Sequence, residues 1–600
     1  MPIQEKTRDE IKDYYKWNLN SIYDNDQNWY TEYEEVKKKV SGFPKYKGII
    51  LDSPGNLLKT LKDFLWLERK LSKLYVYAYM RSDEDTGNTY YQKLKGEVDN
   101  LNVLVSEATS FVVPELIKGD YSKVLKYIDQ LPDLMKYKRM LEDIYRFKKY
   151  TLSEIEEKML SKLTKIFDNP VDTASLLRNS DLVFGTITDE NNNLVELTNS
   201  NYSKYIESQN REVRKQAFMT LYKGYESVKN TLSKTLSGEV DANQTIADIR
   251  GFNSALEMAL FDGNIDNSIY YNLIEVVNKN LKVLHKYYQL KKEVLNVDEL
   301  TLYDVHVPIV KEITETYDFS EAKKLIINAL KVLGDDYITD LNKAFAENWI
   351  DIYPNVGKRS GAYSWGCYDS HPYILLNYQE RFSDVSTLAH ELGHSMHSYY
   401  SRVHNEYQDS HYKIFVAEVA SIVNELLLYQ YMIENAKTDN EKLNMLNNML
   451  ELFKSTLFRQ TMFAEFELEI YNRVSNNEIL THELLSSIYY NLNKKYFGEN
   501  VLVNDEIKYE WARIPHFYMN FYVYQYATGL AAACSIVNDI LSKKPGAVKN
   551  YLEFLKTGNR DYPVELLKIA GIDISKPSAI ENAVKLFDNT IYQFIKLSRK

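Results

Sequence analysis

The sequence predicts a mainly α protein with a small β-sheet, and three observations lead to that prediction. It contains only 21 glycines and 13 prolines among 600 residues, and because these residues interrupt helices, so low a content favours long helices. Apolar residues recur at intervals of three and four from residue 6 to about residue 167, the spacing of one helix face. Strand-like patterns are confined to two short stretches. A hydrophobic share of 44% with 26% charged residues is typical of a globular chain.

The two β signals are each a pair of short strands around a turn. Residues 182–188 and 194–197 flank a run of Asp, Glu and three Asn residues. Residues 360–367 and 373–378 flank a second stretch with turn chemistry, Asp-Ser-His-Pro. Everything after residue 378 is predicted to be helical. We expect a lobe boundary near residue 200, which gives an N-terminal helical lobe with the first hairpin (1–200) and a second domain (201–600).

Charge and cysteine content exclude several classes of protein. Lys and Arg number 73 against 84 Asp and Glu, a net charge of -11, and the absence of a basic tract argues against nucleic-acid binding. Two distant cysteines, Cys367 and Cys534, imply no disulfide framework and predict a reducing compartment. The N-terminus lacks a signal-like apolar stretch, and the most apolar window, 529–537, is far shorter than the ~20 residues that span a bilayer. A cytoplasmic protein without membrane association is expected, and its oligomeric state is left open.

Five of the ten histidines lie between residues 390 and 411, and among them is an H-E-x-x-H pattern, His390-Glu391-Leu-Gly-His394. On a helix the two histidines lie one turn apart on one face, so both can bind one ion at ~2.0–2.1 Å. Glu391 is rotated by ~100° from His390, where a general base for metal-activated water belongs. Chance placement gives on the order of 0.01 matches. Ser383 or Asp384 is the expected N-cap.

A third ligand is expected in the strongly apolar helix at residues 415–428. Its carboxylates, Glu418 and Glu425, are seven residues apart and share a face. A lone buried carboxylate is costly unless it is paired or binds a cation. Glu418 has apolar neighbours on both sides and follows His394 by 24 residues, which makes it the better ligand, and Glu425 is a candidate for orienting a ligand histidine. His397 either touches the metal or packs behind the ligands, and packing is favoured because it lies two turns from His390. Gly393, costly within a helix, indicates a close neighbour.

Three other histidines are expected at the protein surface and not in a metal site. His482-Glu483-Leu-Leu-Ser shares the first two residues of the motif but lacks the second histidine, so it is predicted to be helix surface. His404 and His411 fall in the polar connection between the two helices and are expected at the surface. The alternative interpretation of the motif itself is a pair of solvated histidines with Glu418 half exposed at a helix edge.

The site segments resemble those of a known family, the thimet-oligopeptidase-like zinc peptidases, which include the oligoendopeptidase F group. The likeness covers nearly the whole chain and is carried by residues 17–19, 22–23, 211–218, 303–308, 360–363, 388–400, 415–421 and 514–518. It implies a two-lobed helical ellipsoid with a deep substrate channel, a zinc ion at its floor, a small sheet beside the zinc site, and short peptides as substrates.

The resemblance also implies roles for residues outside the metal motif. The Gly361-Ala362-Tyr363 strand would pair with the extended substrate backbone. His516 would assist the tetrahedral intermediate together with tyrosines, for which Tyr522 and Tyr526 are the best matches. Simple packing is the alternative for both tyrosines, since the chain contains 50 of them. This sequence is also about one residue longer between the histidine and the tyrosine than the thimet branch, with Gly529 where that branch has a further tyrosine.

The predicted function is that of a zinc metalloendopeptidase that hydrolyses internal bonds of short oligopeptides. One zinc ion per chain, held by His390, His394 and Glu418, lowers the pKa of its water towards ~7. Glu391 accepts the proton of that water and returns it to the departing amine. Two alternatives are a zinc exopeptidase with the same site and, less favoured, a metal-free peptide-binding scaffold.

Overall fold

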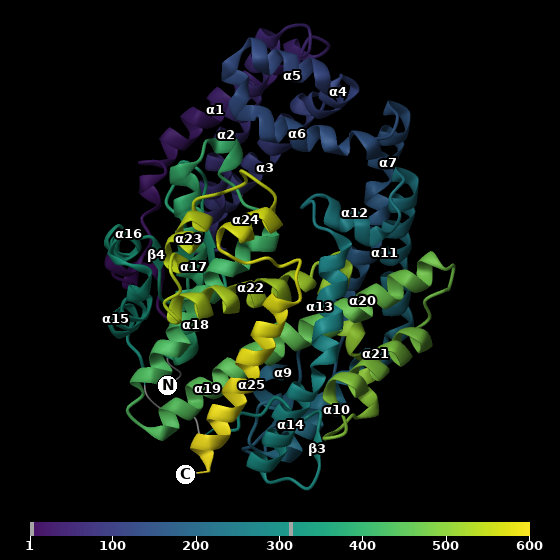
Figure 1. The fold of residues 1–600 in the computed structure, drawn as a ribbon, viewed down its shortest axis with the longest axis vertical. Coiled ribbons are helices and arrows are strands. Elements are labelled where there is room, and N and C mark those ends of the chain that lie inside the picture. The colour runs from purple at the N-terminus through teal and green to yellow at the C-terminus, as the bar shows by residue number, and fades with distance from the viewer. Residues whose placement is uncertain (1–4, 311–315, 600) are drawn as a thin grey trace. The chain divides into compact units, whose positions relative to one another are not determined.

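The computed structural model describes residues 5–310 and 316–599, and 71% of the chain is helical (Figure 1). Its strands, where described, form one three-stranded and two two-stranded sheets. The prediction of a mainly α protein with a small sheet is therefore confirmed. Many helices begin where the sequence supplies a cap. Ser153, for example, accepts the backbone N–H of Glu156, and the Glu156 carboxylate accepts that of Ser153, so two otherwise unpaired donors are satisfied.

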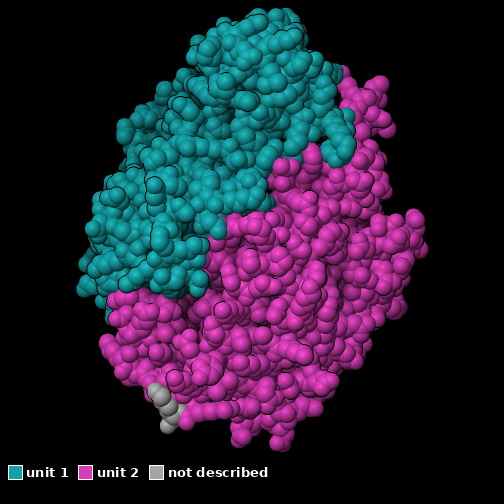
Figure 2. All heavy atoms as spheres, viewed as in Figure 1, with its two compact units in different colours: residues 1–151, 315–428, 536–571 teal, residues 152–314, 429–535, 572–600 magenta. Residues whose placement is uncertain are grey.

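Two compact units make up the chain, and Figure 2 colours them separately. Unit 1 comprises the described residues of 1–151, 315–428 and 536–571, and unit 2 those of 152–314, 429–535 and 572–600. Each unit thus collects three segments that are far apart in sequence. The expected boundary near residue 200 cuts the chain once, into 1–200 and 201–600, whereas each unit combines three separate segments. The expected boundary remains a prediction.

Unit 1 contains the strands of the three-stranded sheet and the helix that carries the H-E-x-x-H motif. Its helices and strands are α1 (Asp26–Ser41), α2 (Pro54–Glu84), α3 (Thr89–Thr109), α4 (Val112–Lys118), α5 (Tyr121–Gln130), α6 (Lys138–Arg146), α15 (Phe319–Leu330), α16 (Asp335–Ala346), β4 (Ile350–Asp351), β5 (Tyr363–Trp365), β6 (Tyr373–Leu375), α17 (Phe382–His404), α23 (Ala547–Leu555) and α24 (Pro563–Ile569). Two helices, α18 (Ile414–Asn435) and α22 (Tyr524–Leu541), run across the division between the units.

The three-stranded sheet has the order β4-β6-β5. The predicted pair β5 and β6 is antiparallel, with Ser364 opposite Ile374, whereas β4 is parallel to β6 and was not predicted. A two-residue strand such as β4 carries too short a pattern to be found in sequence. Helix α17 packs against β5 and β6 on one side and against α15, α16 and α23 elsewhere, so the motif helix lies at the centre of unit 1.

Unit 2 is also mainly helical and contains the two two-stranded sheets. Its elements are α7 (Glu154–Phe167), α8 (Asn169–Leu176), β1 (Thr186–Thr188), β2 (Leu194–Glu196), α9 (Tyr202–Ile206), α10 (Arg211–Ser227), α11 (Lys229–Arg250), α12 (Ala255–Phe261), α13 (Asn267–Lys279), α14 (Leu281–Leu295), β3 (Leu300–Thr301), α19 (Asp439–Phe453), α20 (Arg459–Ser475), α21 (His482–Phe497), β7 (Val501–Leu502) and α25 (Ser578–Ser598).

The first predicted strand pair is confirmed as the antiparallel hairpin β1–β2. The prediction that everything after residue 378 is helical is wrong at one place, because β7 is extended and pairs in parallel with β3. The two partners are two hundred residues apart in sequence. Their pairing depends on tertiary structure and leaves no periodic signal in either segment.

One helix among the described residues, α18, is long and apolar enough by length and composition to cross a membrane. Of its most apolar window, 72% is buried within the protein. The helix also carries Glu418 and Glu425, whose oxygen atoms hydrogen-bond to other side chains of unit 1. These features are those of a core helix that presents two carboxylates.

Candidate metal centre

Helix α17 carries the motif and starts at Phe382, one residue before the first of the two expected caps. Its N-cap is Arg381, and the carboxylate of Asp384, in the first turn, accepts the backbone N–H groups of Gln379 and Arg381 at 2.9 Å each. The prediction of Ser383 or Asp384 as the N-cap is therefore wrong, because Asp384 caps the helix from inside the first turn. The apolar side chains of Val385, Leu388, Leu392 and Met396 on this helix are fully buried, while Tyr399 is only half-buried.

Three predicted ligand atoms converge on one point. The Nε2 atoms of His390 and His394 are 3.2 Å apart, and each lies 3.5 Å from Oε2 of Glu418. Ligands bound tetrahedrally at ~2.0–2.1 Å lie ~3.3 Å from one another. Among the described residues these three form a group of potential metal ligands with all donor atoms within 4.8 Å. Donor types and spacing both fit a zinc ion, as the sequence predicted.

Glu425 fixes the orientation of the His390 ring through a hydrogen bond to Nδ1. Its Oε2 lies 3.0 Å from Nδ1 of His390, and its Oε1 accepts a hydrogen bond from Ser386 at 3.1 Å. With Nδ1–H donated to the carboxylate, Nε2 is left with its lone pair towards the other ligands. Burial alone would lower the pKa of His390, but the hydrogen bond and charge of Glu425, with further help from Glu391 and Glu418, raise it to about 9. The negative groups that favour a proton there favour a metal cation too.

Glu418 is held as an anion by its neighbours. Burial alone would raise its pKa, but the hydrogen bond and charge of His394, followed by His390 and Ser421, lower the pKa of Glu418 to about 2. Ser421, one turn along α18, donates its hydroxyl to Glu418 Oε2 at 3.0 Å. Asn424 then ties the two helices together, since its Nδ2 donates to the carbonyl oxygen of Ala389 at 3.1 Å.

Ser386, Ser421 and Asn424 were not among the sequence predictions. Their signal was helical spacing alone: Ser386 lies four residues before His390, and Ser421 lies three after Glu418. That signal does not separate them from the many other hydroxyl and amide residues on helices. Their partners became identifiable only when α17 and α18 were placed against each other.

Gly393 is the point of closest approach of α17 to α18. A Cβ atom at this position would lie 2.5 Å from both the carbonyl oxygen of Ala420 and the Cα of Ser421. Real Cβ atoms do not come this close to backbone, so only glycine allows α17 to lie at this depth. The expected close neighbour is therefore the ligand helix itself, and this contact brings Glu418 within reach of the two histidines.

Glu391 lies beside the ligand group, not within it. Its side chain is 7% exposed, and burial raises the pKa of its carboxyl, while the nearby charges of His390 and His394 lower it. A carboxyl whose proton affinity is raised in this way suits a group that must accept a proton and release it again.

His397 packs and is not part of the ligand group. Its ring is 1% exposed and stacks on Tyr412, with ring centres 3.8 Å apart and planes 3° apart. Both ring nitrogens are buried without a hydrogen-bond partner, and burial lowers the pKa of His397 to about 3. In the motif-like sequence that begins at His482, Glu483 is exposed at the start of α21. His404 and His411, which follow the motif, are also exposed.

The predicted substrate strand lies against α17. Ser364 of β5 and Ser395 of α17 share a hydrogen bond between their hydroxyl groups at 2.8 Å. Gly361, just before β5, is exposed and has a φ of +88°, a conformation that favours glycine. Gly361 and Ala362 also line a pocket of about 320 Å³ that extends to Thr387, one turn before His390.

His516, Tyr522 and Tyr526 lie together in unit 2. Their ring centres are 5.5–6.1 Å apart, and all three side chains are half-buried. By contrast, Tyr518 and Tyr524, which lie in the same segment, are 9% and 1% exposed. Exposure thus distinguishes the predicted Tyr522 and Tyr526 from Tyr518 and Tyr524, which pack. Partial burial lowers the pKa of His516.

The segment that holds this cluster contains an unusual turn. Asn520 and Phe521 have φ angles of +39° and +59°, which places two consecutive non-glycine residues in the left-handed region. The buried carboxylate of Glu467, on α20, accepts the backbone N–H of Phe521 at 2.5 Å. Burial raises the pKa of Glu467 to about 8. Sequence reasoning missed Glu467, which follows no recognisable motif.

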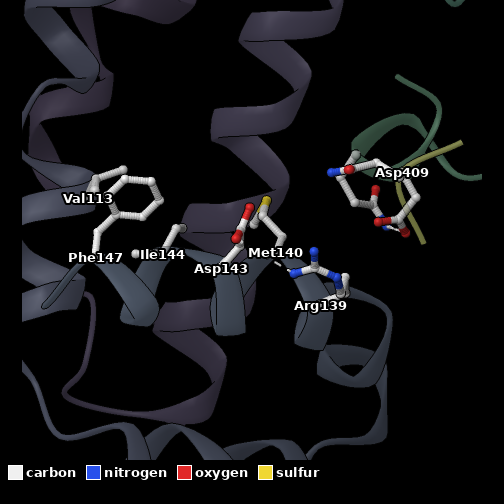
Figure 3. Close-up of a pocket in the computed structure, with 9 residues that line it drawn as sticks. Val113, Arg139, Met140, Asp143, Ile144, Phe147 and Asp409 are labelled. Atoms are coloured by element: carbon white, nitrogen blue, oxygen red, sulfur yellow. Dashed lines mark hydrogen bonds and ion pairs between the residues drawn. The ribbon is translucent and has the colours of Figure 1, made fainter. Parts of the chain in front are cut away.

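A further pocket in unit 1, with a volume of about 260 Å³, contains none of the predicted site residues (Figure 3). It is lined by Val113, Arg139, Met140, Asp143, Ile144, Phe147, Gln408, Asp409 and Asn559. In Figure 3, Val113 and Phe147 lie at one end and Asp409 at the other. The presence of a pocket therefore does not by itself mark the candidate metal centre in this protein.

Comparison with known proteins is consistent with the geometry. Residues 204–586 match the model of peptidase family M3, and residues 115–184 match that of oligopeptidase F. The chain belongs to peptidase family M3. It is an oligopeptide-cleaving metallopeptidase, as the family implies, and the resemblance found in the sequence is confirmed.

Curated relatives match this M3 peptidase along its full length. It is 42% identical to oligopeptidase PepF of Bacillus subtilis over 99% of this chain and 88% of the relative. It is 37% identical to an oligoendopeptidase F homologue of Lactococcus lactis, over 99% of both chains.

Among solved structures, a putative peptidase from Chlamydophila abortus superimposes with a TM-score of 0.92 at 38% identity, covering 99% of this chain and 100% of the other. Oligoendopeptidase-F from Enterococcus faecium gives 0.76 at 35% identity, covering 96% and 100%. The full-length coverage shows that the likeness is not limited to the motif.

Proposed function

We propose that this M3 peptidase is a zinc endopeptidase that cleaves internal bonds of short peptides, with one zinc ion per chain held by His390, His394 and Glu418. The observation that carries the proposal is the convergence of two imidazole Nε2 atoms and one carboxylate oxygen at 3.2–3.5 Å. A bound zinc ion would supply positive charge that polarises the scissile carbonyl and lowers the pKa of a water molecule towards ~7.

Glu391 is the proposed general base. Its carboxylate accepts a proton from the attacking water and passes it to the departing amine nitrogen, so the same oxygen atoms act as base and then as acid. Burial raises the pKa of the carboxyl, which strengthens it as a proton acceptor. Glu425 keeps His390 oriented through the Nδ1 hydrogen bond.

His516, Tyr522 and Tyr526 are proposed to donate hydrogen bonds to the oxygen of the tetrahedral intermediate, as the resemblance implies. Their mutual proximity and their accessible rings support the proposal. Removal of one such donor typically costs ~2.7–4 kcal/mol of barrier. The alternative, that both tyrosines only pack, predicts a much smaller loss.

The substrate backbone is proposed to pair with β5 next to Gly361, Ala362 and Tyr363. Strand β5 is at the edge of its sheet and pairs, within the described residues, with β6 alone, so one side of its backbone is available for an added strand. A cytoplasmic location and the absence of nucleic-acid or membrane partners complete the proposal. Both cysteines are free and buried, as suits a reducing compartment.

The deciding experiment is Glu391→Gln, with Glu483→Gln as the matched control. Glu483 follows a histidine in a sequence that resembles the motif, but it is exposed at the start of α21. We expect Glu391→Gln to retain its metal, measured by elemental analysis, while kcat on a fluorogenic peptide falls by ~10²–10⁴-fold. The control should match the wild type. Substantial residual turnover in Glu391→Gln would contradict the general-base role.

A peptide blocked at both ends distinguishes the endopeptidase from the exopeptidase alternative. We expect internal cleavage of this peptide, detected by mass spectrometry of the products. An end-trimming enzyme would leave it intact.

A further inference from the structure

Three aromatic side chains form a cluster at the edge of the three-stranded sheet. Tyr75 and Tyr79 of α2 stack with ring centres 4.1 Å apart and planes 19° apart. Trp365 of β5 meets them edge-on, at 6.2 Å from Tyr75 and 6.1 Å from Tyr79. All three are half-buried, so part of each ring remains accessible. We name these three residues the aromatic ledge.

The backbone register shows which groups of β5 face the open edge. The N–H groups of Ile374 and Leu376 bond to the carbonyl oxygens of Trp349 and Asp351 on the β4 side, both at 2.8 Å. Because backbone groups alternate along a strand, Tyr373 and Leu375 of β6 face β5. Their partners there are Trp365 and Tyr363, which leaves the N–H and C=O of Ser364 directed outwards.

Side chains alternate along β5 as well. The Ser364 hydroxyl bonds to Ser395 of α17, so this face of the strand is directed towards the motif helix. Trp365 and Tyr363 therefore project on the opposite face, where Trp365 meets α2. In an added strand, residues directly opposite each other have side chains on the same face. A substrate residue opposite Ser364 would point to the α17 face, and its neighbour opposite Trp365 would lie beside the aromatic ledge.

We propose that the aromatic ledge, Trp365 with Tyr75 and Tyr79, is a specificity subsite that binds an aromatic side chain of the substrate residue opposite Trp365. This inference rests on the proposed pairing of the substrate with β5. Aromatic rings have electron-rich faces and electron-poor edges, so rings at this spacing favour another aromatic ring in offset-stacked or edge-on contact.

The surroundings of the ledge favour an uncharged side chain. The phenol of Tyr79 is already committed to Asp99, to which it donates a hydrogen bond at 2.8 Å. The ammonium group of Lys95 lies 4.3 Å from the centre of the Tyr79 ring, so a cationic substrate side chain would meet a like charge there. An aromatic ring gains the same contacts without that repulsion.

The test uses doubly blocked peptides that differ only by Phe or Ala at each position in turn, assayed as kcat/KM. For the wild type we expect one position at which Phe is preferred over Ala by ~10-fold or more. Trp365→Ala should reduce that preference, taken as the ratio of kcat/KM for the Phe peptide to kcat/KM for the Ala peptide within the same variant, to about twofold. Tyr75→Leu, which keeps an apolar side chain on α2, gives a second measurement that does not depend on a change in β5.

Trp66→Ala is the matched control, because Trp66 is a half-buried tryptophan on the same helix whose recorded cation–π partners are Lys39 and Lys70. A Phe preference that survives both Trp365→Ala and Tyr75→Leu overturns the ledge as its source. The absence of any preferred position, with normal cleavage, overturns the subsite as well. If the wild type cleaves none of the peptides, the proposed function fails, and the subsite fails with it.

Discussion

The metal centre of unit 1 and the His516 cluster of unit 2 are built in opposite ways. At the candidate metal centre, two helices carry every proposed ligand, and the ligand atoms lie 3.2–3.5 Å apart. Glu425 accepts a hydrogen bond from His390, and Ser421 donates one to Glu418. The members of the His516 cluster lie on either side of the turn at residues 520–521, from a short 3-10 helix that holds His516 to the first turn of α22, which holds Tyr526, and their rings are 5.5–6.1 Å apart. Regular helices position groups through short-range spacing, whereas a turn needs outside support to do so.

That support is visible around Phe521. A non-glycine residue in the left-handed region costs on the order of 1–3 kcal/mol, and two are adjacent here. The Glu467 carboxylate accepts the Phe521 N–H, and the Phe521 ring packs on Tyr471 and Tyr270 with ring centres 4.5 and 5.5 Å away. The comparison teaches that the metal centre depends on helix contacts, whereas the His516 cluster depends on a buried acid and on packing.

The largest expected effect concerns a ligand of the metal centre. Glu418→Gln should lower zinc affinity by more than ~100-fold and abolish activity unless metal is added in excess. Glu425→Gln, which changes only the group behind His390, should lower it by ~10–100-fold. Both are measured by competition with a chelating dye. Equal effects of the two substitutions would contradict the assignment of Glu418 as a ligand.

The next largest effects concern the proposed hydrogen-bond donors of unit 2. His516→Ala should lower kcat by ~10²–10³-fold with unchanged zinc content, because a stabilising donor is lost while the metal centre remains. Tyr522→Phe and Tyr526→Phe, measured separately, show which hydroxyl contributes, and Tyr271→Phe, an exposed tyrosine of the same unit, serves as control. A normal kcat in both tyrosine variants would support the packing interpretation of these residues.

Gly393→Ala tests the helix contact. The added methyl group meets backbone atoms at 2.5 Å, so we expect the free energy of unfolding to fall by ~1–3 kcal/mol and zinc affinity to fall with it. Gly96→Ala is the matched control. It lies inside α3 with open space around its Cβ position, and alanine there should stabilise the protein by ~0.5–1 kcal/mol. Destabilisation of similar size in both variants would contradict a specific contact at Gly393.

The smallest effect is a change in pH dependence. Burial raises the pKa of Glu467 to about 8, so between pH ~4.5 and ~8 the native state holds a proton that the unfolded state has released. The contribution of Glu467 to stability therefore falls as pH rises through this window. Glu467→Gln cannot titrate, so its Tm relative to the wild type should increase from pH 5 to pH 8. A constant difference in Tm would show that Glu467 is ionised in the native state.

Sequence and structure agree where short-range spacing decides the outcome. The mainly α class, both predicted strand pairs and the placing of His390 and His394 on one face of a helix follow from patterns of two, three and four residues. The errors are of two kinds. The N-cap of α17 was misplaced locally, because the Asp384 carboxylate accepts hydrogen bonds from the two preceding backbone N–H groups of Gln379 and Arg381. The strands β3, β4 and β7 were missed because partners from elsewhere in the chain make them strands.

The amino-acid sequence by itself determined the helical class and placed His390, Glu391 and His394 on the motif helix, because helical periodicity sets the direction of side chains before any tertiary contact forms. The family followed from the resemblance of the site segments. Only the tertiary structure decided the partner of His390, the contact at Gly393, the position of β5 at a sheet edge and the role of Glu467 beneath Phe521. Each of these depends on which backbone or side-chain atom lies opposite, and that follows from the packing of elements far apart in sequence.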